Sequence, residues 1–196
     1  MRWVRAEPLH VTLCFLGDLG AAQIDLVIAA ARDAAASSRG FDVAVAGLGV
    51  FPNARRPRVL WAGVTDGGVE LTGLRSELIG HLARGGLAVD DSHFTPHVTL
   101  GRVGPDASRA DCEKIAMAIE ARGDIADPRA GSMMNRPLRP SDSFAGGGGL
   151  ESGTGSAMGR PPRSSRFVAR KLTVMESVLG REGSRYVVIE RSALSR

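Results

Sequence analysis

The sequence predicts an α+β fold, in which antiparallel strands and helices build one domain. Three observations predict it. Apolar and polar residues alternate in several short runs, apolar residues recur every three to four positions in longer ones, and a proline-containing turn joins two strand-like runs. The 196 residues, 43% of them hydrophobic, suffice for a sizeable core, because a chain of this length buries roughly 70% of its unfolded surface.

Strand and helix patterns alternate in the first part of the chain. From Leu9 to Phe15, apolar residues take every second position, which predicts a strand with one buried face. Apolar residues at helical spacing predict a helix from about Ala21 to Ser37, which Gly40 would end. The β-rich runs Phe41–Val45 and Val59–Val64 flank the turn sequence FPNARRPR and therefore predict a β-hairpin.

The later elements are predicted from the same patterns. Leucines on one helical face from Leu71 to Leu82 predict a second helix, which two glycines end. We expect a strand at Thr95–Val103 and a third helix at Ser108–Arg122. The β-rich runs Phe167–Met175 and Ser184–Glu190, joined by GREG, predict a closing hairpin.

Residues from about Asp127 to Arg166 differ in composition from the rest of the chain. They include seven glycines between Gly146 and Gly159, several prolines and serines, and almost no periodic apolar pattern. Such a segment buries too little apolar area to offset the entropy of ordering it. We therefore expect a flexible low-complexity insertion at 127–166 within a single domain of residues 1–196.

Charge, cysteines and hydropathy restrict the functional class. The net charge of +4 and the pI near 9.8 favour a phosphate-bearing substrate but are modest beside those of a protein that coats nucleic acid. Cys14 and Cys112 lack CxxC spacing and lie among apolar residues, which indicates reduced thiols and a cytoplasmic location. The sequence has no run of 18 apolar residues and no secretory signal, so we expect no membrane partner.

The tetrapeptide His-Val-Thr-Leu occurs twice, at His10–Leu13 and at His97–Leu100. Both copies lie in runs predicted as strands, where side chains two positions apart project from the same face. Each copy therefore presents an imidazole beside a hydroxyl. If the two strands lie side by side about a pseudo-twofold axis, the four side chains converge on one pocket.

Such a pocket suits the opening of a cyclic phosphodiester. One group must take a proton from water, and another must give a proton to the leaving ribose oxygen. Histidine serves either role near neutral pH, so His10 and His97 are the candidate catalytic residues. The hydroxyls of Thr12 and Thr99 can donate hydrogen bonds to the non-bridging phosphate oxygens, where negative charge accumulates in the transition state.

The segments LHVTLCFLGDL and FTPHVTLGRV resemble the two HxTx motifs of the 2H phosphoesterase superfamily. They are most similar to its RNA 2′,3′-cyclic phosphodiesterases, first described as 2′-5′ RNA ligases. The segments RWV, GLGVFPNARRPRVLWAGV and SRYVVIERSAL resemble the same family. The resemblance implies two pseudo-symmetric lobes, with antiparallel sheets lining a central cleft and helices outside. It also implies a hydrolase without metal or other cofactor, which opens 2′,3′-cyclic phosphates of RNA or nucleotides to 2′-phosphates, or ligates RNA. We expect a monomer.

The resemblance also implies roles for individual residues. His10 corresponds to the proton donor and His97 to the proton acceptor, while the two threonines bind the phosphate. Phe94 and Arg102 match family positions too, which implies stacking on a base and contact with the phosphate. The family usually has a strand and a helix before RWV, so this chain is expected to lack them and to expose a sheet edge.

The sequence gives weaker support for a metal site, for a phosphate-binding loop and for roles of the remaining basic residues and histidines. The histidines and carboxylates lack the HExxH, HxH and CxxC spacings of zinc sites, and the glycine-rich segments lack the order GxxxxGK[ST] of a phosphate loop. Arg55, Arg56 and Arg58 form a basic cluster, either a solvated turn or a contact with an RNA backbone. His81 and His93 lack a threonine partner, so we interpret them as a helix-end residue and a loop residue.

Two alternatives to an enzyme remain open from the sequence. One is a non-catalytic module that binds a nucleotide or RNA in the same cleft, and the other is an inactive fragment truncated at its N-terminus. The presence of both histidines and both threonines favours the enzyme, because binding alone does not require a paired acid and base.

Overall fold

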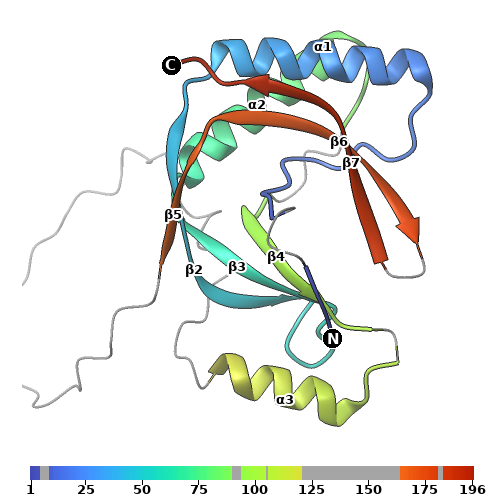
Figure 1. Cartoon of the computed structure of the whole chain (residues 1–196), viewed down its shortest axis with the longest axis vertical. Coiled ribbons are helices and arrows are strands. Elements are labelled where there is room, and N and C mark those ends of the chain that lie inside the picture. Colours follow the sequence, from blue (N-terminus) through green and yellow to red (C-terminus); the bar gives the residue numbers. More distant parts are fainter. Residues whose placement is uncertain (5–8, 90–93, 105, 121–163, 181–182) are drawn as a thin grey trace, which may run out of the picture.

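The computed structural model of the chain describes residues 1–4, 9–89, 94–104, 106–120, 164–180 and 183–196. These residues form two antiparallel sheets and three helices, which confirms the predicted α+β class (Figure 1). Helices α1 and α2 lie towards one end of the molecule and α3 lies at the other, with most of the larger sheet between them (Figure 1). No helix in the described ranges is long and apolar enough to cross a membrane.

The larger sheet has five strands: β1 (Arg2–Trp3), β2 (Phe41–Phe51), β3 (Val59–Asp66), β4 (His97–Arg102) and β5 (Ser165–Ala169). Their order is β1-β4-β3-β2-β5, and each neighbouring pair is antiparallel. The predicted hairpin is confirmed as β2 and β3, and both strands extend beyond the predicted runs. Two register shifts interrupt the pairing: Thr65 is the extra residue of β3 in one, and Gly47 is the extra residue of β2 in the other.

Helix α1 (Ala21–Ser37) has the predicted bounds, and α3 (Arg109–Glu120) lies within its predicted range. Helix α2 (Gly68–Arg84) begins before the leucine stripe because the chain turns sharply at Gly67, directly after β3. Gly67 has a φ of +82°, and a Cβ there would overlap the carbonyl oxygen of Asp42. This turn therefore requires glycine.

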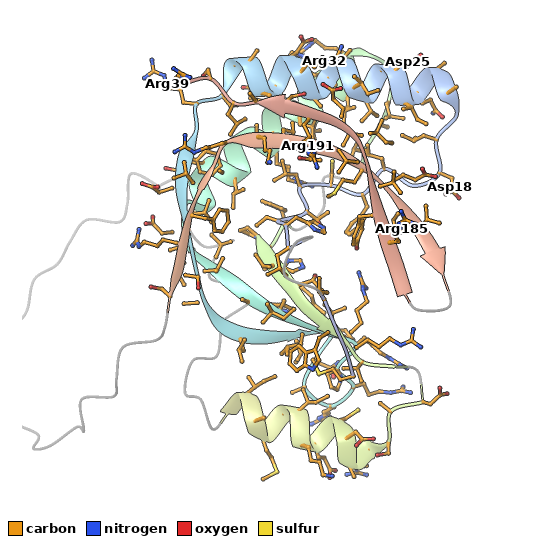
Figure 2. The ribbon with its side chains drawn as sticks, viewed as in Figure 1. Asp18, Asp25, Arg32, Arg39, Arg185 and Arg191 are labelled. Carbon is orange, nitrogen blue, oxygen red and sulfur yellow. The ribbon has the colours of Figure 1, made fainter. Side chains whose placement is uncertain are left out.

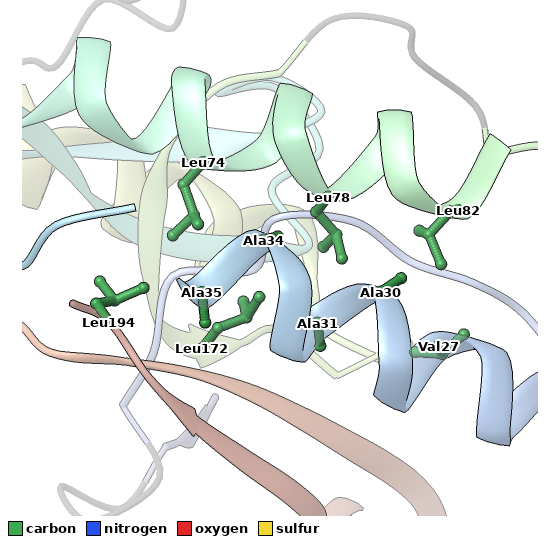
Figure 3. Packing of buried hydrophobic residues seen from close by; sticks show 10 residues of the cluster. All are labelled: Val27, Ala30, Ala31, Ala34, Ala35, Leu74, Leu78, Leu82, Leu172 and Leu194. Carbon is green, nitrogen blue, oxygen red and sulfur yellow. The ribbon is translucent and has the colours of Figure 1, made fainter. Parts of the chain in front are cut away.

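The main core lies between α1, α2 and the C-terminal strands (Figure 3). Helix α1 contributes mostly alanines, and their small side chains leave room for the predicted leucine stripe of α2 to pack close to the helix backbone. The C-terminal strands add two leucines to the same cluster. Its buried members are Val27, Ala30, Ala31, Ala34, Ala35, Leu74, Leu78, Leu82, Leu172 and Leu194.

The smaller sheet consists of β6 (Lys171–Gly180) and β7 (Gly183–Ala193), which confirms the predicted closing hairpin. The prediction of one strand at Phe167–Met175 is wrong, because the chain changes sheets at Arg170: β5 pairs with β2, whereas β6 pairs with β7. The end of the predicted insertion, at Ser165 and Arg166, lies in β5. The insertion's residues 127–163 lie outside the described residues.

The predicted strand from Leu9 to Phe15 is also wrong. Within the described part of the chain, this segment makes a single antiparallel bridge, between Val11 and Val98. A strand needs a hydrogen-bonding neighbour along its length, and β4 provides one only at this point. Leu9 and Phe15, expected in the core, are accordingly 43% and 80% exposed. The predicted strand at Thr95–Val103 is confirmed as β4.

An ion pair joins α1 to β7. Arg32 donates from Nε and Nη2 to the two carboxylate oxygens of Glu190, each over 3.1 Å. In Figure 2, Arg32 lies on α1, and the labelled Arg191 marks the strand β7, which also carries Glu190. These hydrogen bonds, together with the positive charge of Arg32, hold the pKa of the Glu190 carboxyl below its ordinary value of 4.5.

We predict that Glu190→Gln makes the stability of the folded protein less dependent on pH in the acidic range. A carboxyl whose pKa is lower in the folded state stabilises the protein above its unfolded pKa, and this contribution is lost as the pH falls through the folded pKa. Melting temperatures measured from about pH 7 to pH 3 should therefore fall less steeply below pH 4.5 for Glu190→Gln than for the wild type. The exposed Glu77 gives the control Glu77→Gln, and identical slopes for all three proteins would contradict this account.

Candidate active site

The first motif segment meets β4 at the central valines of the two motifs, which form an isolated antiparallel bridge. Residues directly opposite one another in an antiparallel pair project from the same face, and their neighbours project from the other face. Continued by one residue on each side, this register would set His10 opposite Thr99 and Thr12 opposite His97. The bridge brings the backbones of the two motifs together, and all four histidine and threonine side chains are partly buried.

His97 is the first residue of β4, and a backbone carbonyl two residues earlier orients its ring. Nδ1 of His97 lies 2.7 Å from the carbonyl oxygen of Thr95. A carbonyl oxygen only accepts hydrogen bonds, so in the neutral ring the proton belongs on Nδ1. Nε2 then carries the free lone pair that a general base needs.

An aromatic wall, formed by Phe51 and Trp61, packs against His97. The ring of Phe51 meets His97 edge-on with centroids 5.1 Å apart, and the indole of Trp61 is tilted towards it at 5.8 Å. The two wall residues stack on each other at 5.0 Å. Trp61 is only 1% exposed, and its ring covers Gly49 of β2, where a Cβ would overlap it. The aromatic wall therefore restricts the orientation of the imidazole.

His10 contacts the C-terminal hairpin. Its ring packs against Tyr186 of β7 in an edge-to-face arrangement, with centroids 5.0 Å apart and planes at 76°. Such pairs are favoured because the positive edge of one ring meets the negative face of the other. The N-terminal motif and the C-terminal hairpin therefore meet at this imidazole.

A cavity of about 1820 Å³ adjoins the first motif segment. It extends between the larger sheet, α1, α2 and β6, and its lining is largely aliphatic, with Val98 and Leu100 from β4. His97 and Thr99 alternate with these two residues along β4 and are absent from the described residues that line the cavity. The cavity thus lies on the side of β4 that carries Val98 and Leu100, and His10 and Thr12 of the first motif segment also line it.

Phe94 and Arg102 are placed differently from the four motif residues. The guanidinium carbon of Arg75 lies 5.1 Å from the centroid of the Phe94 ring and covers one of its faces. Arg102 is exposed at the end of β4, opposite Arg2 of β1. A register shift follows Thr99 in β4: Thr99 pairs with Trp61 and Arg102 with Val59, two positions apart on β3, so Arg102 projects from the same face of the sheet as Thr99. Base stacking and phosphate contact by Phe94 and Arg102 stay predictions.

The remaining residues considered from the sequence are two histidines and an arginine cluster. Nδ1 of His81 lies 3.6 Å from the carboxylate of Asp33, which links α2 to α1, and His93 lies outside the described residues. In the arginine-containing loop, Oδ1 of Asn53 accepts hydrogen bonds from the next two arginine amides, a turn that leaves their side chains exposed. Among the described residues, no three His, Cys, Asp or Glu side chains group closely enough to hold a metal ion.

Comparison with known proteins identifies the family to which the chain belongs. The family model described as the 2′-5′ RNA ligase superfamily matches residues 2–126, which is more than half of the 196 residues. The chain belongs to the 2′-5′ RNA ligase superfamily. This confirms the resemblance that the two motifs suggest.

Several known proteins resemble the chain in sequence. A protein of Aquifex aeolicus (strain VF5) named RNA 2′,3′-cyclic phosphodiesterase is 41% identical over 103 residues, covering 52% of this chain and 55% of the relative. A protein of the same name from Methanothermobacter thermautotrophicus is 32% identical over 133 residues, covering 68% of each. The chain spans little more than half the length of several relatives that it matches.

Solved structures share the fold. The protein TT0787 of Thermus thermophilus superposes with a TM-score of 0.61 at 22% identity, covering 98% of this chain and 81% of that one. E. coli LigT complexed with 3′-AMP superposes with a TM-score of 0.60 at 23% identity, covering 100% of this chain and 82% of that one. These likenesses confirm the α+β fold with antiparallel sheets and outer helices.

Three residues that contact the histidines were not assigned a role from the sequence. Phe51 and Trp61 flank the turn of the β2–β3 hairpin, and Tyr186 lies in the last strand, far from His10 along the chain. The only available signal was that their segments, GLGVFPNARRPRVLWAGV and SRYVVIERSAL, resemble the family. Which side chains of these segments meet the imidazoles depends on strand register, which the sequence does not specify.

Proposed function

We propose that this protein hydrolyses 2′,3′-cyclic phosphates on RNA ends or nucleotides to 2′-phosphomonoesters. The observation that supports the proposal is the Val11–Val98 bridge, which joins the two motifs at their central valines. An acid, a base and two hydroxyl donors around one point are what in-line opening of a cyclic phosphate requires. The names of the relatives at 32% and 41% identity support the same activity.

In the proposed mechanism, His97 acts as the base. Because Nδ1 is engaged with the Thr95 carbonyl, Nε2 takes a proton from water while the water oxygen attacks phosphorus. The bond from phosphorus to the ribose 3′ oxygen breaks, and His10 gives that oxygen its proton. The product keeps its phosphate on the 2′ oxygen. If a 5′-hydroxyl of RNA attacks in place of water, the same proton transfers yield a 2′-5′ linkage, which is the ligase reaction.

The two threonines serve the phosphate in this proposal. The hydroxyls of Thr12 and Thr99 donate hydrogen bonds to non-bridging oxygens, which gain negative charge as the water oxygen adds. If the register of the Val11–Val98 bridge continues by one residue on each side, each end of the proposed site pairs one proton-transfer group with one phosphate donor. The protein's own donors and acid/base groups are then sufficient for the reaction, without a metal.

We further propose a cytoplasmic monomer of two pseudo-symmetric lobes. Cys14 and Cys112 are free thiols, which supports a reducing compartment. Size-exclusion chromatography with light scattering should give the mass of one chain, 20.6 kDa. A mass of twice this value at micromolar concentration would contradict the monomer.

The proposed activity is tested with the purified full chain and 2′,3′-cyclic AMP in the presence of EDTA. Phosphorus NMR distinguishes the cyclic substrate, the 2′-phosphate and the 3′-phosphate. We expect conversion to the 2′-phosphate alone at a rate that EDTA leaves unchanged, because His10 and His97 carry both proton transfers. Accumulation of the 3′-phosphate, or recovery of activity only on adding a divalent metal, would refute the mechanism.

We predict that removing one threonine hydroxyl costs less than removing a histidine. Thr99→Val keeps the shape of the side chain but loses the donor, and should lower kcat by about 10- to 100-fold, the worth of one hydrogen bond to a charged group. Thr99→Ser keeps the hydroxyl and should stay within a few fold of the wild type. Thr12→Val and Thr12→Ser should differ from each other in the same way. Equal losses of kcat in the Val and Ser variants would rule out the hydroxyl as the phosphate donor.

A further inference from the structure

Arg75 is a charged residue on the buried face of α2. It follows Leu74 directly and shares that face with the leucine stripe, yet only 7% of its surface is exposed. Burying a guanidinium among aliphatic side chains is costly unless the charge is hydrogen-bonded. The contacts of Arg75 therefore indicate why a charge is kept at this position.

Two of these contacts reach the two motif segments. Nε of Arg75 donates a hydrogen bond of 3.0 Å to the carbonyl oxygen of Leu13, which directly follows Thr12. The guanidinium carbon lies 5.1 Å from the ring centroid of Phe94, three residues before His97. One side chain of α2 thus contacts both segments that carry the candidate acid and base.

The first motif segment depends on such a contact because it lacks a strand ladder. Apart from the bridge at Val11, its backbone pairs with no strand in the described part of the chain, so the Leu13 carbonyl needs a partner elsewhere. Arg75 provides that partner, and a hydrogen bond from a charged donor is stronger than one from a neutral donor. Its charge also reaches Cys14: burial raises the pKa of that thiol, and Arg75 opposes the rise.

We propose that Arg75 is a positioning residue that holds the His10–Thr12 segment and the Phe94–His97 segment in register for catalysis. This inference rests on the proposed function. Arg75 is almost fully buried, so it acts through Leu13 and Phe94 without touching substrate. Loss of the contact keeps all four motif side chains in the protein but no longer fixes their positions relative to one another.

The test compares Arg75→Ala with Leu78→Ala, which truncates a buried side chain one turn further along the same face of α2. Arg75→Ala should lower kcat for 2′,3′-cyclic AMP by about 10- to 100-fold, because misplacing reacting groups by about 1 Å costs as much. Leu78→Ala should lower the melting temperature but keep kcat within a few fold at a temperature where both variants are folded. Arg84→Met, which removes an exposed arginine of the same helix, should match the wild type.

A second measurement separates positioning from general destabilisation. Guanidinium chloride at a few millimolar should restore part of the kcat of Arg75→Ala, because the free cation fits the space that the side chain vacates, whereas sodium chloride should not. Arg75→Lys should recover less than guanidinium, since its ammonium lacks the planar fork. If Arg75→Ala keeps wild-type kcat, or loses no more than Leu78→Ala and gains nothing from guanidinium, the positioning role is excluded.

The outcomes also separate this inference from the proposed function. If the wild type does not hydrolyse the cyclic phosphate, the proposed function fails, and the contact is then tested by amide hydrogen exchange of residues 9–15. Exchange there should accelerate in Arg75→Ala and slow again with guanidinium, and unchanged exchange would exclude the contact. If the histidine variants lose activity but Arg75→Ala does not, the function stands and the role of Arg75 is rejected.

Discussion

His10→Ala and His97→Ala should each lower the turnover of a 2′,3′-cyclic nucleotide by about 10² to 10⁴, the usual worth of a positioned acid or base. The proposed reaction needs both proton transfers, so neither histidine can replace the other. Both side chains are only partly buried, and truncating them should leave the protein folded. Steady-state kinetics of each variant, alongside melting temperatures, measures the effect.

The pH profile and the leaving group assign the two roles. His97 must be neutral to accept a proton, so His97→Ala should lose the acidic limb of the bell-shaped profile. His10 must be protonated to donate one, so His10→Ala should lose the alkaline limb. A 4-nitrophenyl phosphodiester, whose leaving group departs without a proton, should restore much of the activity of His10→Ala and little of that of His97→Ala. The reverse pattern would exchange the roles of the two histidines.

Gly49→Ala should cause a large loss of stability. A Cβ at this position overlaps the six-membered ring of Trp61, which is 1% exposed and cannot withdraw into solvent. Overpacking of this kind destabilises a fold by about 1–3 kcal/mol. Because Trp61 packs against His97, the variant should also lower kcat.

Denaturant unfolding and tryptophan fluorescence check this prediction. The chain has two tryptophans, so a Trp3→Phe background leaves Trp61 as the reporter of its own displacement. The control is Gly73→Ala, an exposed glycine within α2 whose Cβ would meet nothing within 4 Å. It should stabilise the protein by about 0.5–1 kcal/mol, because glycine is a poor helix residue. Equal effects of the two substitutions would show that the indole does not lie over Gly49.

The elements that the sequence predicted well are those with strong periodic patterns. The α1 bounds and the leucine stripe of α2 follow from helical spacing, which a buried helix face imposes directly. The strand predicted at Leu9–Phe15 failed because alternation marks two faces but does not supply a hydrogen-bonding neighbour. The switch between sheets at Arg170 was missed for a related reason, since both halves are equally β-rich.

The sequence likewise predicted one part of the candidate site and not the other. The His-Val-Thr-Leu repeat identified His10, Thr12, His97 and Thr99 without any structure, because the motif occurs twice and its chemistry is specific. The side chains that orient these residues come from remote elements. Arg75 lies within a stripe that otherwise marks core, and only the packing of α2 against the two motif segments distinguishes it from a surface arginine.

The central claim, that one histidine pair opens a cyclic phosphate, is tested most directly by the double variant His10→Ala/His97→Ala. Its hydrolysis of an RNA oligonucleotide ending in a 2′,3′-cyclic phosphate is compared with that of the wild type, with and without EDTA. We expect the wild type to yield the 2′-phosphate at the same rate in both conditions. The double variant should lose at least as much activity as either single variant, although less than the product of the two losses, because the two residues act as a unit. Full activity in the double variant, or a wild-type activity that EDTA abolishes and added metal restores, would contradict the account.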